Sequence, residues 1–263
     1  MPEFGVLAGS GIYSMPDLEI VESVKVITSY GEPSDHYRIG RLAGREIAFL
    51  PRHGSLHNIP PHRINYRANI RGFRELGVKR IISVGATGGI NREMKPGSLA
   101  LPDQIIDRTS GREATFYDDS EVVHIDFTEP YCPDLRAKLL ASASQADIHL
   151  LDKGTYIAVN GPRLETAAEI REFSLLGADV IGMTGMPEAA LARELEICFA
   201  CLAVVTNVAA GIGEGRLTTT EVVDAMRAST ERINALLKAF FSFNPGAPVC
   251  SCGSSLKNAR MQA

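Results

Sequence analysis

The sequence predicts a single α/β domain in which helices flank a mixed β-sheet. Short apolar runs with strand character alternate with longer segments of helical spacing along most of the chain. The 263 residues are 45% hydrophobic and 22% charged, which is enough for one sizeable core. Glycines and polar residues gather where the apolar runs end, and open α/β sheets bind their ligands at such strand ends.

Composition also excludes several classes of protein. The net charge of −4 offers no basic excess for nucleic acid or an anionic membrane. The N-terminal stretch MPEFGVLAGSGIY has no basic segment, so we expect no signal peptide. No apolar run approaches the roughly 18 residues of a spanning helix. These features predict a cytoplasmic protein.

The first third of the chain reads as strands with one helix. FGVLAGSGIY, residues 4–13, predicts a buried strand that ends in a Gly-Ser-Gly turn, and it lacks the GxGxxG pattern of a dinucleotide site. Alternating runs within 19–50 predict antiparallel strands joined by tight turns. Residues 64–77 have helical spacing and stop at a glycine, and 79–90 predict a buried strand entering a second glycine-rich turn.

The middle of the chain begins with a polar, irregular stretch. Residues 108–132 predict a long loop or lid, and 133–146 predict a helix. A strand over 154–161 leads to a helix that Thr166 could cap. The apolar segment 178–183 predicts another strand.

The chain is organised around the corner that follows, residues 182–188. Pro187 suits the first position of the next helix, because its missing N–H costs nothing there. Free backbone N–H groups at such a helix start point outward and favour an anion. An ordinary strand–turn–helix corner is the alternative interpretation.

The last part of the domain is a strand, a loop and a long helix. Residues 198–207 predict the strand and 209–217 the loop. The helix starts at about Thr219, behind a capping box that begins at Thr218. We expect a domain over 1–243, followed by a flexible tail over 244–263 that is rich in Gly, Pro and Ser.

Five cysteines, an odd number in a long chain, do not form a disulfide framework. We expect Cys132, Cys198 and Cys201 to be isolated core thiols, with no metal bound. Cys250 and Cys252 lie in the tail, where reduced, solvated thiols are expected and a redox pair stays an alternative.

Several groups that suit a phosphate follow predicted strands. Hydroxyls, backbone N–H groups, an Arg fork and a His are all suitable donors. Each alone could be a turn residue, and the His could be a partnered surface imidazole. The residues are Ser10, Arg52, His53, Ala86, Thr87 and Thr184.

Six motifs in order carry a family resemblance: AGSGIY, PRHG followed by INYRANI, VGATGGI, NGPRLETAAE, GMTGMPEAALARE and VVTNVA. Over residues 4–243 the chain resembles the trimeric purine nucleoside phosphorylase and methylthioadenosine phosphorylase family. The resemblance implies a single three-layer α/β/α domain with a mixed, partly barrel-like sheet. It also implies phosphorolysis of a purine nucleoside, and a homotrimer or dimer of trimers. The 108–132 loop with His124 is then the candidate for a neighbour's contribution to the site.

The resemblance also implies roles for individual residues. The phosphate-binding positions are Ser10, Arg52, His53, Gly85, Ala86 and Thr184. The substrate-binding positions are Met183, Asn207, Ala209, Glu165, Thr219 and Thr220. We expect Asn207, Glu165 and His53 to carry the chemistry, with no cofactor and no metal, because inorganic phosphate is the co-substrate.

Hydrogen-bond chemistry predicts the base. The Asn207 amide can donate to O6 of a 6-oxopurine and accept from a protonated N7. The Glu165 carboxylate only accepts, so it suits N1–H and repels the bare N1 of adenine. Methylthioadenosine phosphorylases carry Asp at the positions of Asn207 and Ala209, and a small hydroxyl residue at that of Glu165. These departures favour hypoxanthine over adenine; a carboxylate in a helix's first turn is the alternative for Glu165.

The sugar end favours the methylthio branch. Inosine and guanosine phosphorylases of the family have a His near the start of the last helix, and here Thr219 or Thr220 stands in its place. The expected substrate is therefore 5′-methylthioinosine. An inosine and guanosine phosphorylase, an inactive nucleoside-binding protein and, more weakly, an oligomeric scaffold are the alternatives.

Overall fold

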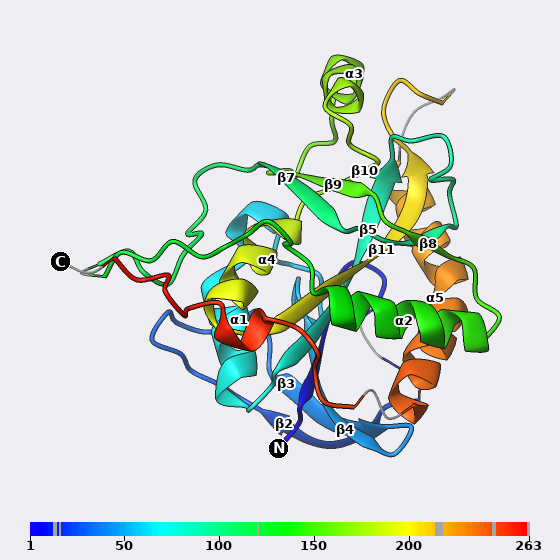
Figure 1. The fold of residues 1–263 in the computed structure, drawn as a ribbon. Helices are drawn as coiled ribbons and strands as arrows, with labels where there is room; N and C mark the ends of the chain where they lie inside the picture. Colours follow the sequence, from blue (N-terminus) through cyan, green and yellow to red (C-terminus); the bar gives the residue numbers. More distant parts are fainter. Residues whose placement is uncertain (13–14, 16, 120, 214–217, 244–245, 262–263) are drawn as a thin grey trace.

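The computed structural model describes residues 1–12, 15, 17–119, 121–213, 218–243 and 246–261. Within them, eleven strands form one mixed sheet (Figure 1). Eight of the strands follow the order β2-β3-β4-β1-β5-β10-β9-β7. The other three form a branch, in which β11 pairs with β5 and β6, and β8 pairs with β6. The strands are β1 (Phe4–Ala8), β2 (Glu19–Val24), β3 (Tyr37–Leu42), β4 (Arg45–Pro51), β5 (Arg80–Gly89), β6 (Leu99–Leu101), β7 (Gln104–Arg108), β8 (Leu150–Asp152), β9 (Thr155–Val159), β10 (Val180–Gly182) and β11 (Cys198–Val208).

Helices cover both faces of this sheet. Helices α2 and α5 pack on one face, α1 and α4 pack on the other, and α3 stands at the end of the sheet near β9 and β10 (Figure 1). The helices are α1 (Tyr66–Glu75), α2 (Pro133–Gln145), α3 (Ala167–Leu175), α4 (Gly185–Glu194) and α5 (Thr219–Ser242), with short 3₁₀ turns η1 (Pro61–Arg63) and η2 (Cys252–Ser254). The predicted three-layer α/β/α fold is confirmed.

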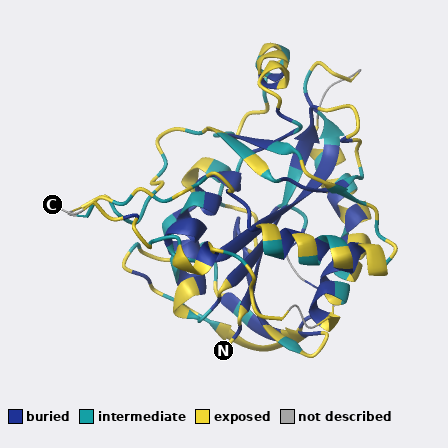
Figure 2. Ribbon diagram, viewed as in Figure 1, coloured by how far each residue is buried: buried dark blue, intermediate teal, exposed yellow. Residues whose placement is uncertain are grey.

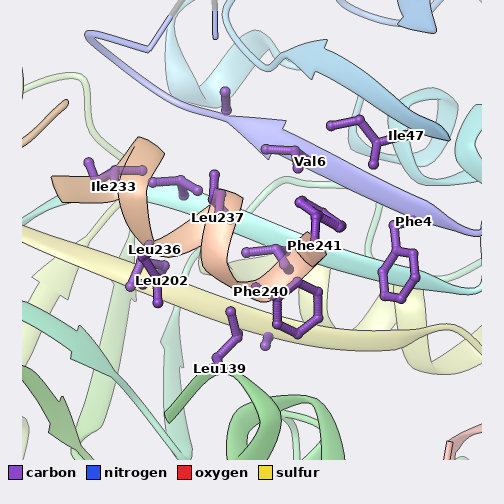
Figure 3. Close-up of a cluster of buried hydrophobic side chains, with 14 of the residues drawn as sticks. Phe4, Val6, Ile47, Leu139, Leu202, Ile233, Leu236, Leu237, Phe240 and Phe241 are labelled. Atoms are coloured by element: carbon purple, nitrogen blue, oxygen red, sulfur yellow. The ribbon is translucent and has the colours of Figure 1, made fainter. Parts of the chain in front are cut away.

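The core under α5 shows why this helix belongs to the domain. Phe4 of β1 meets Phe240 and Phe241 edge to face, with ring centroids 5.7 and 5.5 Å apart (Figure 3). Such pairs add about 0.5–1.5 kcal/mol each beyond the area they bury. Burial follows the sheet and the inner faces of the helices, while the outer faces are exposed (Figure 2). The last helix is thereby fixed against the centre of the sheet.

Local signals set the helix starts, as predicted for Thr166 and Thr218. Thr166 and Glu169 form a capping box at α3, and Thr218 and Glu221 form another at α5. Asn65 caps α1 by accepting from the Ala68 N–H. Strands β2, β3 and β4 pair antiparallel, as predicted for 19–50. Within the described residues of 109–132 no helix or strand is present.

Parallel pairing brings four strand ends together. β1 pairs parallel with both β4 and β5, and β11 pairs parallel with β5. The carboxyl ends of these strands therefore share one edge of the sheet. β10 approaches the same edge from the opposite direction, because it pairs antiparallel with the end of β5. Residues that follow β1, β4 and β10 thus lie beside those in β5 and β11.

The C-terminal segment lies on the domain. Cys252 is buried, and Arg260 forms a β-bridge with Val123 of the 109–132 loop. The expectation that these tail cysteines are solvated is therefore wrong for Cys252, because apolar neighbours cover it. The expectation that Cys132 and Cys198 are isolated thiols is wrong as well, because their sulfur atoms lie within 4.8 Å of each other and of those of the two tail cysteines. The flexibility expected of 244–263 stays a prediction, and residues 244–245, 262–263, 120 and 214–217 lie outside the described residues. No described helix is long and apolar enough to span a membrane.

Candidate active site

A cavity of about 510 Å³ opens at the shared strand edge. Its size lies within the ordinary range of small-molecule sites, roughly 300–1,000 Å³. Most predicted site residues line it: Ser10, Arg52, His53, Gly85, Ala86, Glu165, Met183, Thr184, Asn207 and Thr219. Thr220 and Ala209 do not line it; Thr220 is exposed, and Ala209 is buried in the cluster under α3.

Arg52 lies at the floor of the cavity and is almost fully buried. Its Nε donates to Glu188 Oε1 at 2.5 Å, and its Nη2 contacts Glu188 Oε2 at 3.1 Å and Ser83 Oγ at 2.6 Å. Nη1 donates to the Val84 carbonyl at 3.1 Å. A Cβ on Gly9 would lie 2.7 Å from Nη1, so only glycine allows this approach.

The Arg52 fork is therefore occupied by protein rather than open to a ligand. Glu188, in the first turn of α4, balances its charge, and both side chains are at most 1% exposed. Among the described residues, one N–H of Nη1 remains without a partner. Glu188 was not predicted as a site residue. The sequence signal for it is an acidic residue in a helix turn whose other residues face the core.

His53 is neutral in this environment. Burial, the nearby Arg52 charge and His57 lower its pKa to about 4, against a weaker opposing effect of a hydrogen bond with the Ile59 carbonyl. Nδ1 lies 2.8 Å from that carbonyl oxygen, which places the proton on Nδ1 and leaves Nε2 as an acceptor. Nε2 can then accept from a protonated phosphate oxygen, or take up a proton when a dianion arrives.

The corner between β10 and α4 differs in detail from the prediction. The backbone N–H groups of Thr184 and Gly185, expected to face an anion, both lie 3.4 Å from the Tyr156 hydroxyl. Tyr156 comes from β9, and its hydroxyl takes up two N–H groups that precede Met186, whose extended backbone separates them from the helical turn that starts at Pro187. The expectation of free N–H groups at that helix start stays a prediction. The Thr184 side chain still lines the cavity.

Met183 is held at the cavity by a close approach of backbone. A Cβ on Gly161 would lie 2.4 Å from the Met183 sulfur, and Gly161 has φ +61°. Both the space and the backbone conformation require glycine there. The turn after β9 therefore fixes the thioether of Met183.

Arg112, from the 109–132 loop, was not predicted. Its Nη1 donates to the carbonyls of Met183 at 2.8 Å and Met186 at 2.6 Å, and its Nη2 donates to Asn160 O at 3.0 Å. Its guanidinium also lies 5.0 Å from the Tyr66 ring centroid. Arg112 thus joins the loop to both sides of the Met183 turn, and a lone Arg in a polar loop gives no sequence signal of this.

A β-bulge presents Asn207 to the cavity. Val205 pairs with Thr87 and Asn207 with Gly88, so Thr206 is the extra residue on β11. The Thr206 hydroxyl lies 2.8 Å from Asn207 Oδ1, and Asn207 Nδ2 donates to Val208 O at 3.0 Å. The amide is held in one orientation and keeps one N–H and one lone pair free.

Glu165 lines the same cavity just before Thr166, the N-cap of α3, so the first-turn alternative does not apply. Burial raises the pKa of the Glu165 carboxyl, and the negative charge of Glu169 raises it further. A hydrogen bond from its own backbone N–H and the charge of Arg163 oppose this rise. Arg163 instead forms a fork with Glu169 at 2.8 and 2.6 Å. In the described part of the chain no other side chain donates to Glu165, which leaves its carboxylate available to a ligand.

The rim near α5 is apolar. Thr219, Val222 and Val223 line the cavity, together with Leu164. Val223 is 42% exposed and Leu164 is 40% exposed, although both face the cavity. Sequence reasoning missed the two valines, whose signal is a helix start with consecutive apolar residues after the cap.

The cavity can thus hold a polar, planar group between Asn207 and Glu165 and an anion near Ser10, His53 and Thr184. Its wall by α5 accepts an apolar group. The residues supply donors and acceptors, and the chemistry they suit is positioning and charge stabilisation.

Comparison with known proteins gives consistent matches. Residues 3–242 match the model of the Phosphorylase superfamily. A protein of Thermodesulfovibrio yellowstonii named probable S-methyl-5′-thioinosine phosphorylase is 49% identical over 258 residues, 98% of this chain and 97% of its own. The 6-oxopurine nucleoside phosphorylase of Pyrococcus furiosus is 48% identical over 267 residues, 98% and 99%. A solved methylthioadenosine phosphorylase from an Antarctic soil metagenomic library is 35% identical with a TM-score of 0.93, covering 100% of this chain and 93% of its own.

Proposed function

Because the chain belongs to the Phosphorylase superfamily, we propose that it cleaves S-methyl-5′-thioinosine with inorganic phosphate. The products are hypoxanthine and 5-methylthioribose 1-phosphate. The observation that carries this proposal is the placement of Asn207 and Glu165 in one cavity with the predicted phosphate positions. An amide and an unpartnered carboxylate match the O6 acceptor and N1–H donor of a 6-oxopurine.

In this proposal, phosphate binds to hydroxyl groups, backbone groups and one side-chain N–H of the cavity. Ser10 and Thr184 supply hydroxyls, Gly85 and Ala86 supply backbone groups, and Arg52 Nη1 supplies its remaining N–H. His53 contacts a phosphate oxygen through Nε2. The cluster of these groups at the cavity supports this arrangement.

The reaction needs positioning more than a protein nucleophile. The glycosidic bond lengthens first and the sugar becomes oxocarbenium-like. Phosphate then stabilises and captures the cation from the opposite face, and no Ser or Cys is consumed. Asn207 accepts from N7–H of the leaving base while Met183 lies against the sugar.

The sugar end accounts for the methylthio group. Val222 and Val223 line the cavity with Thr219, and no His stands at the start of α5. A buried hydroxyl without a partner costs roughly 1–3 kcal/mol, or about ten- to a hundredfold in kcat/KM. A methylthio group carries no such cost against valine.

One assay tests the proposal: base release from methylthioinosine, inosine, guanosine and methylthioadenosine, with and without phosphate. Methylthioinosine should have the highest kcat/KM, and release should require phosphate. Thr184→Ala and His53→Ala should raise the KM for phosphate. Equal release in phosphate-free buffer identifies a hydrolase instead.

A 6-oxopurine nucleoside phosphorylase acting on inosine and guanosine is the second candidate. The Pyrococcus relative with that name favours it, at an identity close to that of the methylthioinosine relative. Equal kcat/KM for inosine and methylthioinosine would select this candidate. An inactive nucleoside-binding protein would show ligand stabilisation without hypoxanthine release.

Assembly and location complete the proposal. A homotrimer or dimer of trimers is supported by Val223 and Leu164, which line the cavity and yet are exposed in one chain. The loop with His124, which also exposes Val122, is the proposed neighbour contribution. A cytoplasmic location is proposed with it, and cell fractionation tests that part.

A further inference from the structure

The turn over 182–185 brings Met183 and Thr184 to the cavity, and a residue that does not line the cavity supports it from inside the domain. Tyr156 of β9 is buried, and β9 pairs parallel with β10, the strand that ends in this turn. A Cβ on Gly182 would overlap the Tyr156 hydroxyl, and a Cβ on Gly185 would lie 2.9 Å from Cε1 of the Tyr156 ring. Both glycines of the turn are therefore needed to admit one tyrosine ring.

The Thr184 side chain is not used to cap the helix that follows it. Thr184 is the N-cap of α4, and its side chain forms no capping hydrogen bond. A threonine at an N-cap usually accepts from the N–H of the second or third helical residue. Here the second residue, Met186, has an extended backbone, and the third, Pro187, has no N–H. The Thr184 hydroxyl is thus left to the cavity that it lines.

The Tyr156 hydroxyl accepts the hydrogen bonds of the turn in its place. The backbone N–H groups of Thr184 and Gly185 both donate to the Tyr156 hydroxyl oxygen, at 3.4 Å. This acceptor is neutral, because burial raises the pKa of Tyr156 and keeps the phenol protonated. A carboxylate at the same place could accept from the same two N–H groups, but its charge would repel a phosphate beside Thr184.

The turn is thereby held on both sides. Tyr156 accepts from two of its N–H groups, and Arg112 donates to the carbonyls of Met183 and Met186. We propose that Tyr156 is a positioning residue of the phosphate site, whose hydroxyl fixes the backbone at Thr184 and so directs the Thr184 hydroxyl to the anion. This inference rests on the proposed function, because it takes phosphate to bind beside Thr184.

The variant Tyr156→Phe tests the proposal, since it keeps the ring that the two glycines admit and removes the acceptor. We expect the KM for phosphate to rise about tenfold, because the turn loses two hydrogen bonds and Thr184 is no longer fixed. The KM for the nucleoside should change less than about twofold. The matched control is Tyr131→Phe, at a second buried tyrosine of the same core whose hydroxyl does not bond to the turn, and its KM for phosphate should equal that of the parent.

A double-mutant cycle separates positioning from general support of the fold. Thr184→Ala removes the hydroxyl through which Tyr156 acts, so adding Tyr156→Phe to it should raise the KM for phosphate little further. If Tyr156→Phe raises this KM by the same factor with and without the Thr184 hydroxyl, the positioning role is refuted.

Direct binding distinguishes a failure of this inference from a failure of the proposed function. Calorimetric titration with inorganic phosphate needs no nucleoside, and Tyr156→Phe should bind phosphate about tenfold more weakly than the parent. A parent that neither binds nor requires phosphate defeats the proposed function, and this inference with it. A parent that binds phosphate no more tightly than Tyr156→Phe defeats this inference alone.

Hydrogen exchange of the unmodified protein gives a result that does not depend on the folding of any variant. The amide protons of Thr184 and Gly185 should be protected from exchange before phosphate is added, because the Tyr156 hydroxyl already binds them. Protection that appears only after phosphate is added would show that the anion binds these N–H groups itself, and it would overturn the proposal.

Discussion

At the scale of single residues, Asn207 and Glu165 are expected to select a 6-oxopurine over a 6-aminopurine. Methylthioadenosine would place its N6 donors against amide donors and its bare N1 against a carboxylate. The amide could turn toward N6, but it would then lose the bond from its Nδ2 to the Val208 carbonyl and its acceptor at N7. Two mismatches in a buried site cost several kcal/mol, on the order of a thousandfold in kcat/KM.

We therefore expect Asn207→Asp alone to depress methylthioinosine turnover, since the donor to O6 disappears. Asn207→Asp with Glu165→Ser should move preference toward methylthioadenosine, and buried Ala209 limits the gain. The measurement is kcat/KM for both nucleosides in the parent and both variants. A parent that already prefers methylthioadenosine contradicts the assignment of these two residues.

His53 makes stability depend on pH in a predictable direction. Its folded pKa of about 4 lies below the unfolded value, so the folded state binds fewer protons. The stabilisation is complete above about pH 6.5 and is lost as pH falls through 4, at most about 3 kcal/mol. Urea unfolding at pH 7 and pH 5 should show a smaller acid loss in His53→Asn than in the parent. Equal losses would mean that His53 is not buried as a neutral ring.

Glu188 is predicted to contribute to the free energy of unfolding rather than directly to the reaction. Glu188→Gln keeps the shape but leaves Arg52 buried without its counter-charge, which should cost about 3–5 kcal/mol in unfolding free energy. The control Glu32→Gln breaks an exposed pair with Lys25 and should change little. Similar losses in both variants would refute the buried pair.

These residues mark the limit of sequence reasoning. Ser10 and His53 could be singled out because each follows an apolar run and strand ends meet at one sheet edge, whereas the role expected of Asn207 came from the family resemblance. Glu188 could not, because its partner Arg52 is 136 positions away and no spacing encodes the contact. The contact of the Thr184 N–H with the Tyr156 hydroxyl could not be predicted either, because Tyr156 lies on another strand.

At the scale of elements, the capping boxes and apolar periodicity predicted the helices and most strands, since those signals are local. The 109–132 loop was predicted only as irregular. Its function depends on where Arg112 reaches, and this is set by the packing of β9 and α4 rather than by neighbours in the chain.

Arg112 is predicted to be a positioning residue. Arg112→Ala frees the carbonyls of Met183 and Met186, so the turn that carries Met183 and Thr184 should loosen. We expect kcat/KM to fall about ten- to a hundredfold, with the KM for phosphate raised. Arg112→Lys should restore little, since one ammonium cannot span both sides of the turn.

Arg108→Ala is the matched control, because Arg108 ends β7 and pairs only loosely with Glu172 at 3.6 Å. Its kinetics should equal those of the parent. Unchanged kinetics in Arg112→Ala would show that the turn holds without the loop.

At the scale of the whole molecule, the exposed cavity rim predicts assembly. Light scattering at micromolar concentration should give the mass of three chains, or of six. His124→Ala should reduce activity if the loop completes a neighbour's site, whereas His149→Ala, of an exposed His just before β8, should not. A fully active monomer would refute both parts.

The buried pair of Arg52 and Glu188 has a kinetic consequence. Their charges cancel and His53 is neutral, so these three side chains present no net positive charge to an incoming phosphate. They therefore contribute no electrostatic steering, which accelerates association and weakens steeply with salt. Raising the ionic strength should accordingly not slow phosphate entry, whereas the entry of a steered anion would slow.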